Sequence, residues 1–433
     1  MRLKFYSSLF IGLLIVLQAV QPCKAQAVDT LRVMQYNLLH YGKQIYDCND
    51  SNNSRDDKNT SLRIILKYAQ PDIFAVNEMD GEDADAQYLL DHALNVNGKR
   101  KYRRAAFEGD YLVNTLFYNS EKLALKSQDR IVNGSDQHDI NVYHLYYKKN
   151  LKQGKDTTFL TCFVVDLKAG EERSSERLRA RETQRLMDYR EENDLTGNVL
   201  VMGDFNVYDS EEEAFQNFVE PMDEELKLYD PINTPGSWHD TEEFAQYHTQ
   251  STHMGGDCAA WGGLDDRFDF ILMSKSLGKG SSKLKYQPGS YEVLGQDGEH
   301  FDKELIDGGN ETYDSELTQA LYKVSDHLPV FMKIQVLEKV SSGKSQLLSR
   351  EQNVRFNNPV HEKLNLKIDW GQQASLQVEV LSIIGKVVFR KKVEVQSGVQ
   401  ALSIPFSSFE KGMYLLKISD DSNHFLVKKV LKY

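Results

Sequence analysis

The chain has 433 residues, enough for two or three domains, and a net charge of −12. The charge is uneven, since residues 340–433 hold 14 Lys and Arg against 8 Asp and Glu, which leaves 38 against 56 for the rest. A net charge of −18 on the longer part excludes a broadly basic surface of the kind that binds nucleic acid without sequence preference.

The N-terminus has the layout of a secretory signal peptide. Arg2 and Lys4 precede an apolar stretch at residues 9–20, and small residues follow at Ala25 and Ala27. Because this stretch is shorter than the ~20 residues that cross a bilayer, we expect cleavage after one of these alanines rather than a membrane anchor. No other segment is apolar enough to span a membrane.

Three cysteines remain once Cys23 leaves with the signal peptide: Cys48, Cys162 and Cys258. An odd number cannot all pair within the chain, and an exported protein of this size does not need a disulfide framework. One bridge is compatible with the sequence, but the spacing does not demand it.

Short apolar runs alternate with polar stretches over the first 336 residues, and several runs end on a carboxylate or a carboxamide. Their composition predicts strands, each with a polar residue at one end. The predicted strands are residues 31–37, 72–78, 114–119, 157–168, 198–202, 267–273 and 327–336.

Two amphipathic helices are predicted between these strands. Residues 60–69 place apolar side chains on one face, with Asn59 or Thr60 as the N-cap and Pro71 as the stop. Residues 174–192 are rich in Arg and Glu, which is typical of a solvated helix with i,i+4 ion pairs. Because helices are too few to follow every strand, a layered α/β sandwich fits better than a doubly wound sheet.

The polar residues after the run 198–202 are the first candidates for chemistry. We expect Gly203 to break the strand and to expose Asp204 and Asn206, since such groups are costly to bury without partners. A simple turn at Gly203 is the alternative interpretation.

Asp269 and the pair Asp326-His327 are the next candidates. Asp269 lies between two phenylalanines of a predicted strand, so it needs a partner such as His327 or Arg267. Asp326-His327 stands at the entrance of the last predicted strand, where the pair alone could serve only to cap a turn.

The joint order of these residues is more specific than any one of them. Gly203-Asp-Phe-Asn206, Asp265-Asp-Arg-Phe-Asp269 and Ser325-Asp-His327 resemble motifs of the endonuclease/exonuclease/phosphatase superfamily, which includes DNase I-like nucleases, sphingomyelinases and inositol polyphosphate phosphatases. The resemblance covers residues 30–336. It implies a four-layer αββα sandwich that hydrolyses phosphoric esters with a divalent metal.

Each candidate residue receives a role from this resemblance. Asn37 and Glu78 would hold Mg²⁺, or else Mn²⁺ or Ca²⁺, and Asp326 would support the metal or the base. Hard oxygen ligands of this kind favour such ions over zinc.

The remaining roles concern water and proton transfer. Asp204 and Asn206 would position and activate the attacking water. Asp269 would orient His327, which would contact the scissile phosphate and help proton transfer.

One position departs from the family pattern. Family members often carry His-Leu at the end of the strand before the Arg-rich helix, where this chain has Asp166-Leu167-Lys168. A second catalytic histidine is therefore missing there, unless His138 or His144 substitutes for it. Asp166 could be a further metal ligand and Lys168 a phosphate contact, or the two form an ordinary surface pair.

The C-terminal part has its own pattern. Five short alternating runs, separated by turn signals, predict a small all-β sandwich after a linker rich in Ser, Gly, Lys and Gln. Asn358-Pro-Val360, Ile384-Gly-Lys386, Lys411-Gly-Met-Tyr414 and the basic end resemble a type A sorting domain of the type IX secretion system. A carbohydrate-binding or adhesive sandwich is the alternative.

These interpretations give a signal peptide (1–25), a catalytic domain (28–337), a linker (338–352) and a sorting domain (353–433). We expect a monomer, exported through the periplasm of a Gram-negative bacterium by the type IX machinery and then secreted or attached to the cell surface. The expected activity is that of a phosphodiesterase, first of all an endonuclease acting on extracellular DNA or RNA. A phosphatase or phospholipid headgroup esterase is the alternative within the same chemistry, and a catalytically silent surface adhesin is the non-enzymatic one.

Overall fold

The computed structural model describes residues 26–106, 112–134, 138–148, 157–256, 258, 260–280, 283–338, 353–369, 373–383, 386–396, 399–420 and 425–433. Ala27–Glu338 form one compact unit, and the described residues from 353 onward belong to a second. The predicted signal peptide and residues 339–352 of the predicted linker lie outside the described residues.

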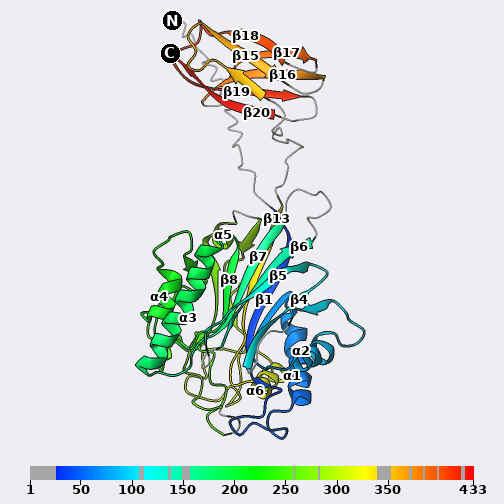
Figure 1. The fold of residues 1–433 in the computed structure, drawn as a ribbon, viewed down its shortest axis with the longest axis vertical. Coiled ribbons are helices and arrows are strands. Elements are labelled where there is room, and N and C mark those ends of the chain that lie inside the picture. Colours follow the sequence, from blue (N-terminus) through cyan, green and yellow to red (C-terminus); the bar gives the residue numbers. More distant parts are fainter. Residues whose placement is uncertain are drawn as a thin grey trace, which may run out of the picture. The chain divides into compact units, whose positions relative to one another are not determined.

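Two mixed β-sheets form the centre of the larger unit (Figure 1). The first sheet has the order β11 (Leu284–Tyr286), β13 (Val330–Glu338), β1 (Gln26–Tyr41), β2 (Ile73–Asp80), β4 (Leu112–Asn119), β3 (Tyr102–Arg104), with β12 (Glu292–Val293) also paired to β13. The second sheet has the order β5 (Leu123–Ile131), β6 (Ile140–Tyr147), β7 (Thr158–Asp166), β8 (Val199–Asp204), β10 (Asp269–Ser274), β9 (Leu228–Tyr229).

Helices cover the outer face of each sheet (Figure 1). The first sheet is covered by α1 (Arg55–Ala69), α2 (Asp83–Leu89), the following π-helical turn η1 (Leu90–Leu94) and α6 (Ser315–Val324). The second is covered by α3 (Arg173–Glu192) and α4 (Glu213–Val219). The short helices η3 (Glu242–Tyr247) and α5 (Lys275–Lys279) lie in the connections around β10.

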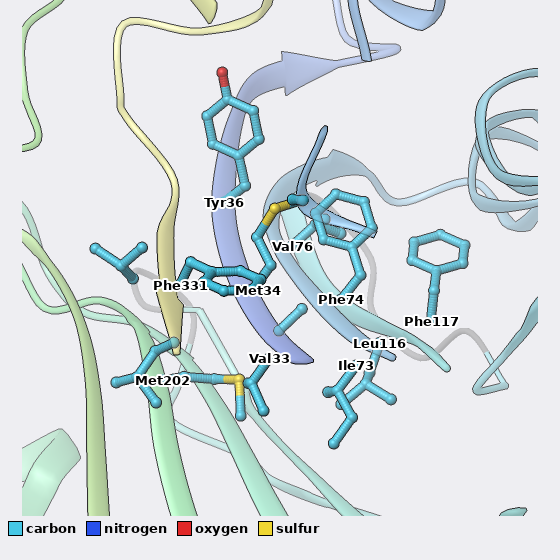
Figure 2. Close-up of a cluster of buried hydrophobic side chains, with 14 of the residues drawn as sticks. Val33, Met34, Tyr36, Ile73, Phe74, Val76, Leu116, Phe117, Met202 and Phe331 are labelled. Atoms are coloured by element: carbon cyan, nitrogen blue, oxygen red, sulfur yellow. The ribbon is translucent and has the colours of Figure 1, made fainter. Parts of the chain in front are cut away.

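Two apolar cores hold these layers together. The first includes Met202 of the second sheet together with Met34 and Val76 of the first (Figure 2), which places part of it between the sheets. The second joins Phe163 and Phe270 of the second sheet to side chains of α3 and α4. The order helix, sheet, sheet, helix confirms the predicted αββα sandwich.

Helix α1 begins earlier than the sequence suggested. Ser54 is its N-cap and accepts a hydrogen bond from the backbone N–H of Asp57, so the predicted caps Asn59 and Thr60 lie inside the helix. The apolar face starts later than the helix. The first turn carries polar residues instead, and the buried Lys58 that follows it donates to the carbonyl oxygen of Leu38 on β1. The predicted stop is correct, since the helix ends at Ala69, two residues before Pro71.

The C-terminal unit is a small all-β sandwich, as predicted. One sheet has the order β14 (Asn353–Phe356), β15 (Lys363–Asp369), β18 (Val399–Pro405), and the other β17 (Val387–Val395), β16 (Ala374–Ser382), β19 (Gly412–Asp420), β20 (Phe425–Lys432). Alternate residues of the strands, such as Leu366, Val378 and Leu416, form its core. Among the helices that the structure describes, none is long and apolar enough to cross a membrane.

Candidate active site

Three aspartates lie in one row across the second sheet. Asp166 ends β7, Asp204 ends the parallel neighbour β8, and Asp269 begins the antiparallel neighbour β10. The pairing register sets Asp204 directly opposite both of the others, so it is the middle member of the row. Adjacent strands are about 4.8 Å apart, which brings the three carboxyl groups to one end of the sheet.

Gly203 does not break strand β8, contrary to the sequence interpretation. The strand continues through it to Asp204, and Gly203 pairs with Val165 of β7. Its φ is +149°, and a Cβ at this position would lie 1.8 Å from the carbonyl oxygen of Val165. Glycine is needed here because β7 approaches too closely for any side chain.

Asp204 and Asn206 are buried rather than exposed, with 2% and 7% of their surface accessible. Oδ1 of Asp204 accepts a hydrogen bond from the backbone N–H of Asn206 (3.1 Å), and Nδ2 of Asn206 donates to the carbonyl of Leu167 (3.0 Å). Nδ2 of Asn37 donates to Oδ2 of Asp204 (3.1 Å). These partners offset the cost of burial that led us to expect exposure.

Glu78 faces the row from the first sheet. Its Oε1 accepts a hydrogen bond from Nδ2 of Asn37 (2.9 Å), and its Oε2 lies 2.8 Å from Nδ1 of His40. Burial alone would raise the pKa of Glu78, but the hydrogen bond and charge of His40, together with the amide of Asn37, hold that pKa well below its usual range. Glu78 is therefore an ionised carboxylate at neutral pH.

His327 is held by Asp269, one of its two predicted partners. Nδ1 of His327 lies 2.7 Å from Oδ2 of Asp269, while Nε2 lies 3.7 Å from Asp204 and 4.0 Å from Asp326. Burial would lower the pKa of His327, but the charges of these three aspartates outweigh it and raise that pKa well above its usual value. Arg267, the other predicted partner, instead makes two 2.9 Å hydrogen bonds to Asp230.

Asp204 responds to the same surroundings. Burial raises the pKa of Asp204 well above its usual value, and the nearby His327 counteracts this rise. Each of these two groups therefore shifts the pKa of the other across 3.7 Å.

Asp166 is paired with a histidine from another part of the chain. Its Oδ2 lies 2.7 Å from Nδ1 of His138, and Asp166 is 5% exposed, so it is not a surface residue. His144, the other histidine considered, has its Nδ1 3.0 Å from Oγ1 of Thr161, five residues back along β7. Of the two histidines, only His138 reaches the row of aspartates.

The contacts that the structure describes for Lys168 are made by its backbone. Its N–H donates to Oε2 of Glu182 on α3 (3.0 Å), and its ammonium group makes no ion pair with the residues that the structure describes. The side-chain contact proposed for Lys168 therefore stays a prediction.

Some groups around the site have no local signal in the sequence. His40 contacts Glu78, and Nε2 of Gln250 lies 3.0 Å from both Asp326 and His327. Thr249 accepts the backbone N–H groups of Phe268 and Asp269 at 3.1 Å. Only the tertiary structure brings these residues near the strand ends.

A further group of possible metal ligands lies in the segment between β9 and β10. His239, Asp265 and Asp266 offer ligand atoms within 4.8 Å of one another, and Nδ1 of His239 is 2.8 Å from Asp266. Asp266 also bridges through its backbone to Gln250. The sequence marked the two aspartates as part of a motif but did not point to His239.

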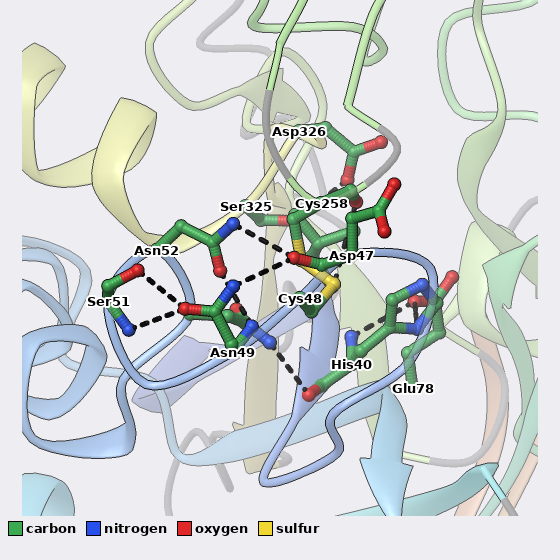
Figure 3. The surroundings of a disulfide bond; sticks show 12 residues. His40, Asp47, Cys48, Asn49, Ser51, Asn52, Glu78, Cys258, Ser325 and Asp326 are labelled. Carbon is green, nitrogen blue, oxygen red and sulfur yellow. Dashed lines mark hydrogen bonds and ion pairs between the residues drawn. A yellow bond between two sulfur atoms is a disulfide. The ribbon is translucent and has the colours of Figure 1, made fainter.

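One disulfide bond joins two loops that are distant in the sequence. Cys48, in the loop after β1, is bonded to Cys258 across 210 residues, and Cys162 is buried and free. His40, Glu78 and Asp326 lie around the bridge (Figure 3). The disulfide thus fastens two loops beside the site.

Family models match both units of the chain. A model described as "Endonuclease/Exonuclease/phosphatase family" matches residues 34–327, more than half of the chain. This chain belongs to that family. A model described as "Secretion system C-terminal sorting domain" matches residues 356–433. The chain is thus a phosphoester hydrolase, exported and either secreted or attached to the cell surface.

Several solved structures resemble this endonuclease/exonuclease/phosphatase protein at low identity. A humanized D. rerio TDP2 is 13% identical, with 71% of this chain and 99% of that chain covered and a TM-score of 0.45. The human Nocturnin catalytic domain with bound sulfate is 16% identical, with 72% and 98% covered and a TM-score of 0.44. A family protein from Bacteroides vulgatus is 15% identical, with 71% and 99% covered and a TM-score of 0.45. No curated protein matches the chain.

Glu182 gives the endonuclease/exonuclease/phosphatase unit a pH-dependent stability. Burial raises the pKa of this carboxyl from 4.5 to about 7, so between these values the folded protein binds more protons than the unfolded chain. Stability must then fall as pH rises through this interval, by up to about 3 kcal/mol. Glu182→Gln keeps an acceptor for the N–H of Lys168 and should remove the fall.

Urea unfolding at pH 5 and pH 8 measures this effect. The free energy of unfolding of Glu182→Gln should exceed that of the native protein at pH 8 by more than it does at pH 5. Glu191→Gln, at the exposed end of the same helix, should show no such pH-dependent difference. A difference between Glu182→Gln and the native protein that is the same at both pH values would contradict the assignment.

Proposed function

We propose that this protein is a divalent-metal-dependent phosphodiesterase that cleaves its substrate by attack of water. One observation carries the proposal: Asn37 links the carboxylates of Glu78 and Asp204, and His327 lies 3.7 Å from the same aspartate. Metal-assisted hydrolysis needs an anionic oxygen site, a positioned water and a proton acceptor within a few ångströms of one another. These residues provide all three at one end of the sheets.

The donor set fits a hard divalent cation. Glu78 is ionised, and its two oxygens face the amide of Asn37 and the ring of His40. Nδ2 of Asn37 donates to both carboxyl groups, and a cation held by these residues would neutralise their negative charge. We propose Mg²⁺ as this ion, with Mn²⁺ or Ca²⁺ as substitutes, held by Glu78 and Asn37 with support from Asp326. When bound, it would neutralise charge on the phosphate and favour the ionised form of Asp204.

The chain's own residues would then orient and deprotonate the water. Asp204 accepts the hydrogen bond of Asn206, which fixes its carboxylate, and its other oxygen faces Nε2 of His327. Asp269 holds Nδ1 of His327, so Nε2 is the nitrogen presented to the phosphate. In this proposal Asp204 and Asn206 position the attacking water. His327 contacts the scissile phosphate through Nε2 and helps proton transfer.

Extracellular DNA or RNA is the substrate that we propose first. Tyr46 and Trp261 are 65% and 70% exposed on the two loops that the disulfide joins, and the ring of Tyr46 lies 5.5 Å from that of His40. Exposed aromatic rings beside a phosphodiesterase site are suited to stacking on bases. The acidic charge of residues 1–339 favours the second candidate, a phosphatase or headgroup esterase whose small substrate needs no extended basic surface.

The export route is also part of the proposal. A signal peptide (residues 1–25) would direct the chain to the periplasm, and the sorting domain would engage the type IX secretion machinery. The catalytic domain would span residues 28–337, with residues 338–352 as the linker, and would act as a monomer.

Metal removal tests the reaction class directly. The full-length mature protein should hydrolyse bis(4-nitrophenyl) phosphate with Mg²⁺ or Mn²⁺, lose at least about 100-fold of its rate after dialysis against EDTA, and recover when the metal is returned. Undiminished hydrolysis in metal-free buffer would contradict the metal proposal. A panel of plasmid DNA, RNA, sphingomyelin and inositol phosphates under the same metals then selects the substrate.

A further inference from the structure

Basic residues are concentrated in one short segment of an otherwise acidic unit. Five of the six residues 99–104 are Lys or Arg, whereas residues 1–339 together hold 38 Lys and Arg against 56 Asp and Glu. The segment forms the loop before β3 and β3 itself. Short basic runs of this kind are typical of surfaces that bind polyanions.

Four of these five side chains make no ion pair with the residues that the structure describes. They are Lys99, Arg100, Lys101 and Arg103, here called the basic patch. Three of them are exposed, and the partly buried Lys101 has its Nζ 4.7 Å from the centre of the Tyr102 ring. Because like charges repel, gathering them costs free energy that a bound anion would offset.

The backbone that carries the basic patch is fixed by its neighbours. The side chain of Asn95 accepts the N–H of Tyr102 (3.1 Å) and donates to the carbonyl of Tyr102 (3.0 Å). The carbonyl of Lys101 accepts hydrogen bonds from the N–H and the hydroxyl of Ser120 (2.7 and 2.8 Å). Since this backbone is already ordered, binding of an anion has a smaller entropic cost.

A hollow of about 780 Å³ opens between η1 and β3, beside the basic patch. Its charged lining consists of Lys99, Arg100, Arg103, Arg104 and Asp91. Four cations against one carboxylate are suited to a phosphate group, whose oxygens accept several charge-assisted hydrogen bonds from Lys and Arg.

The basic patch lies at the end of the first sheet opposite the catalytic residues. Tyr102 pairs with Asn119 at the end of β4, and Tyr118, the residue before Asn119, pairs with Ile73 at the start of β2. Glu78 lies five residues further along β2, about 17 Å from Ile73 at the usual rise of a strand. The patch is therefore separate from the active site.

The described part of the catalytic unit also finishes at this end of the sheet. β13 begins three residues after His327 and runs away from the active site to Glu338. The chain therefore leaves this unit, toward the sorting domain, at the end that carries the basic patch. The catalytic residues lie at the other end.

No track of free positive charge joins the basic patch to the active site among the residues that the structure describes. The cations around the start of α2 are each paired with a carboxylate: Arg104 with Asp83, Lys43 with Asp80, and Arg55 with Asp85. Glu82 adds a further negative charge to this region. A nucleic acid strand that reached from the patch to the site would need such a track, so a partner that contacts the patch alone is favoured.

We propose that the basic patch docks the exported protein on an anionic lipid surface of the cell envelope, with phosphate headgroups bound by Lys99, Arg100 and Arg103. This inference goes beyond the proposed function and does not depend on it. Each basic residue close to such a surface adds to the attraction, which fades within a Debye length of about 10 Å at 0.1 M salt. Docking at this end leaves the catalytic residues, at the opposite end, accessible to substrate.

Vesicle binding tests this docking surface. The full-length mature protein is sedimented with vesicles of phosphatidylcholine that contain about 30% phosphatidylglycerol, and with vesicles of phosphatidylcholine alone. We expect binding to the anionic vesicles at about 50 mM NaCl, at least about 20-fold weaker binding at about 300 mM NaCl, and none to the neutral vesicles. Lys99→Gln/Arg100→Gln/Arg103→Gln should lower the partition coefficient on anionic vesicles at least about 20-fold.

A second triple variant is the matched control. Arg173→Gln/Arg177→Gln/Arg181→Gln removes the same charge from the exposed face of α3 and should lower the partition coefficient less than about 3-fold. The basic sorting unit is the same in both variants, so its contribution cancels from the comparison. Both variants should keep the native melting temperature and the native rate on bis(4-nitrophenyl) phosphate.

Three outcomes would overturn the docking surface. Equal losses in the two triple variants would mean that net charge alone governs binding, and a native protein that does not bind the anionic vesicles would have no such surface. A patch variant that binds vesicles like the native protein, but binds a short single-stranded DNA less tightly, would reassign the patch to nucleic acid. A native protein that binds the vesicles but hydrolyses no ester would contradict the proposed function and support this inference.

Discussion

Asp204→Asn should lower kcat on bis(4-nitrophenyl) phosphate by about 1,000-fold, the largest effect that we expect from a single polar substitution. Asp204 is the middle residue of the row and is contacted by Asn37, Asn206 and His327. An amide in its place keeps the size of the side chain and loses the charge that would bind and deprotonate water. Steady-state kinetics with saturating Mg²⁺ measure the loss.

Thermal unfolding separates this catalytic effect from damage to the fold. Burial disfavours the ionised form of Asp204, so the neutral amide should leave the melting temperature unchanged or raise it. Asp188→Asn, on the exposed face of α3, is the matched control and should keep full activity. Retention of activity within about ten-fold by Asp204→Asn would mean that this carboxylate does not act on the water.

Gly203→Ala should lower the free energy of unfolding by about 3 to 5 kcal/mol. The added Cβ would lie 1.8 Å from the carbonyl oxygen of Val165, and the backbone would keep a positive φ that alanine adopts only with strain. Relief of the clash requires β7 and β8 to separate, which would also displace Asp166 from Asp204. Urea unfolding measures the first effect, and kcat measures the second.

A second glycine provides the control for this prediction. Gly197, just before β8, has open space around its Cα, and alanine there should change the free energy of unfolding by less than about 1 kcal/mol. If Gly203→Ala is as stable and as active as the native protein, the close approach of β7 and β8 does not decide the geometry of the site.

Local patterns predicted the strands and the ends on which the candidate residues lie. Apolar runs placed Asn37, Asp166 and Asp269 on strands, and the structure has each of them on a strand. The same patterns misjudged Gly203, because the deciding contact comes from Val165 of another strand. The start of α1 was misjudged because the cap was sought at the beginning of the apolar face, whereas the N-cap is Ser54, ahead of that face. Burial of Asp204 was misjudged for the same reason as Gly203, since one of its partners, Asn37, is 167 residues distant.

The amino-acid sequence by itself indicated the reaction class and the order of the layers, through motifs that resemble those of the endonuclease/exonuclease/phosphatase family, and local hydrophobic patterns agreed with a layered α/β sandwich. It also indicated export, through the residues that resemble a sorting domain. Only the tertiary structure decided that His138 and not His144 joins Asp166, that Cys48 pairs with Cys258, and that His40 contacts Glu78. Each of these contacts links segments of the chain that the local pattern treats as separate, and their meeting depends on how the two sheets and their loops pack.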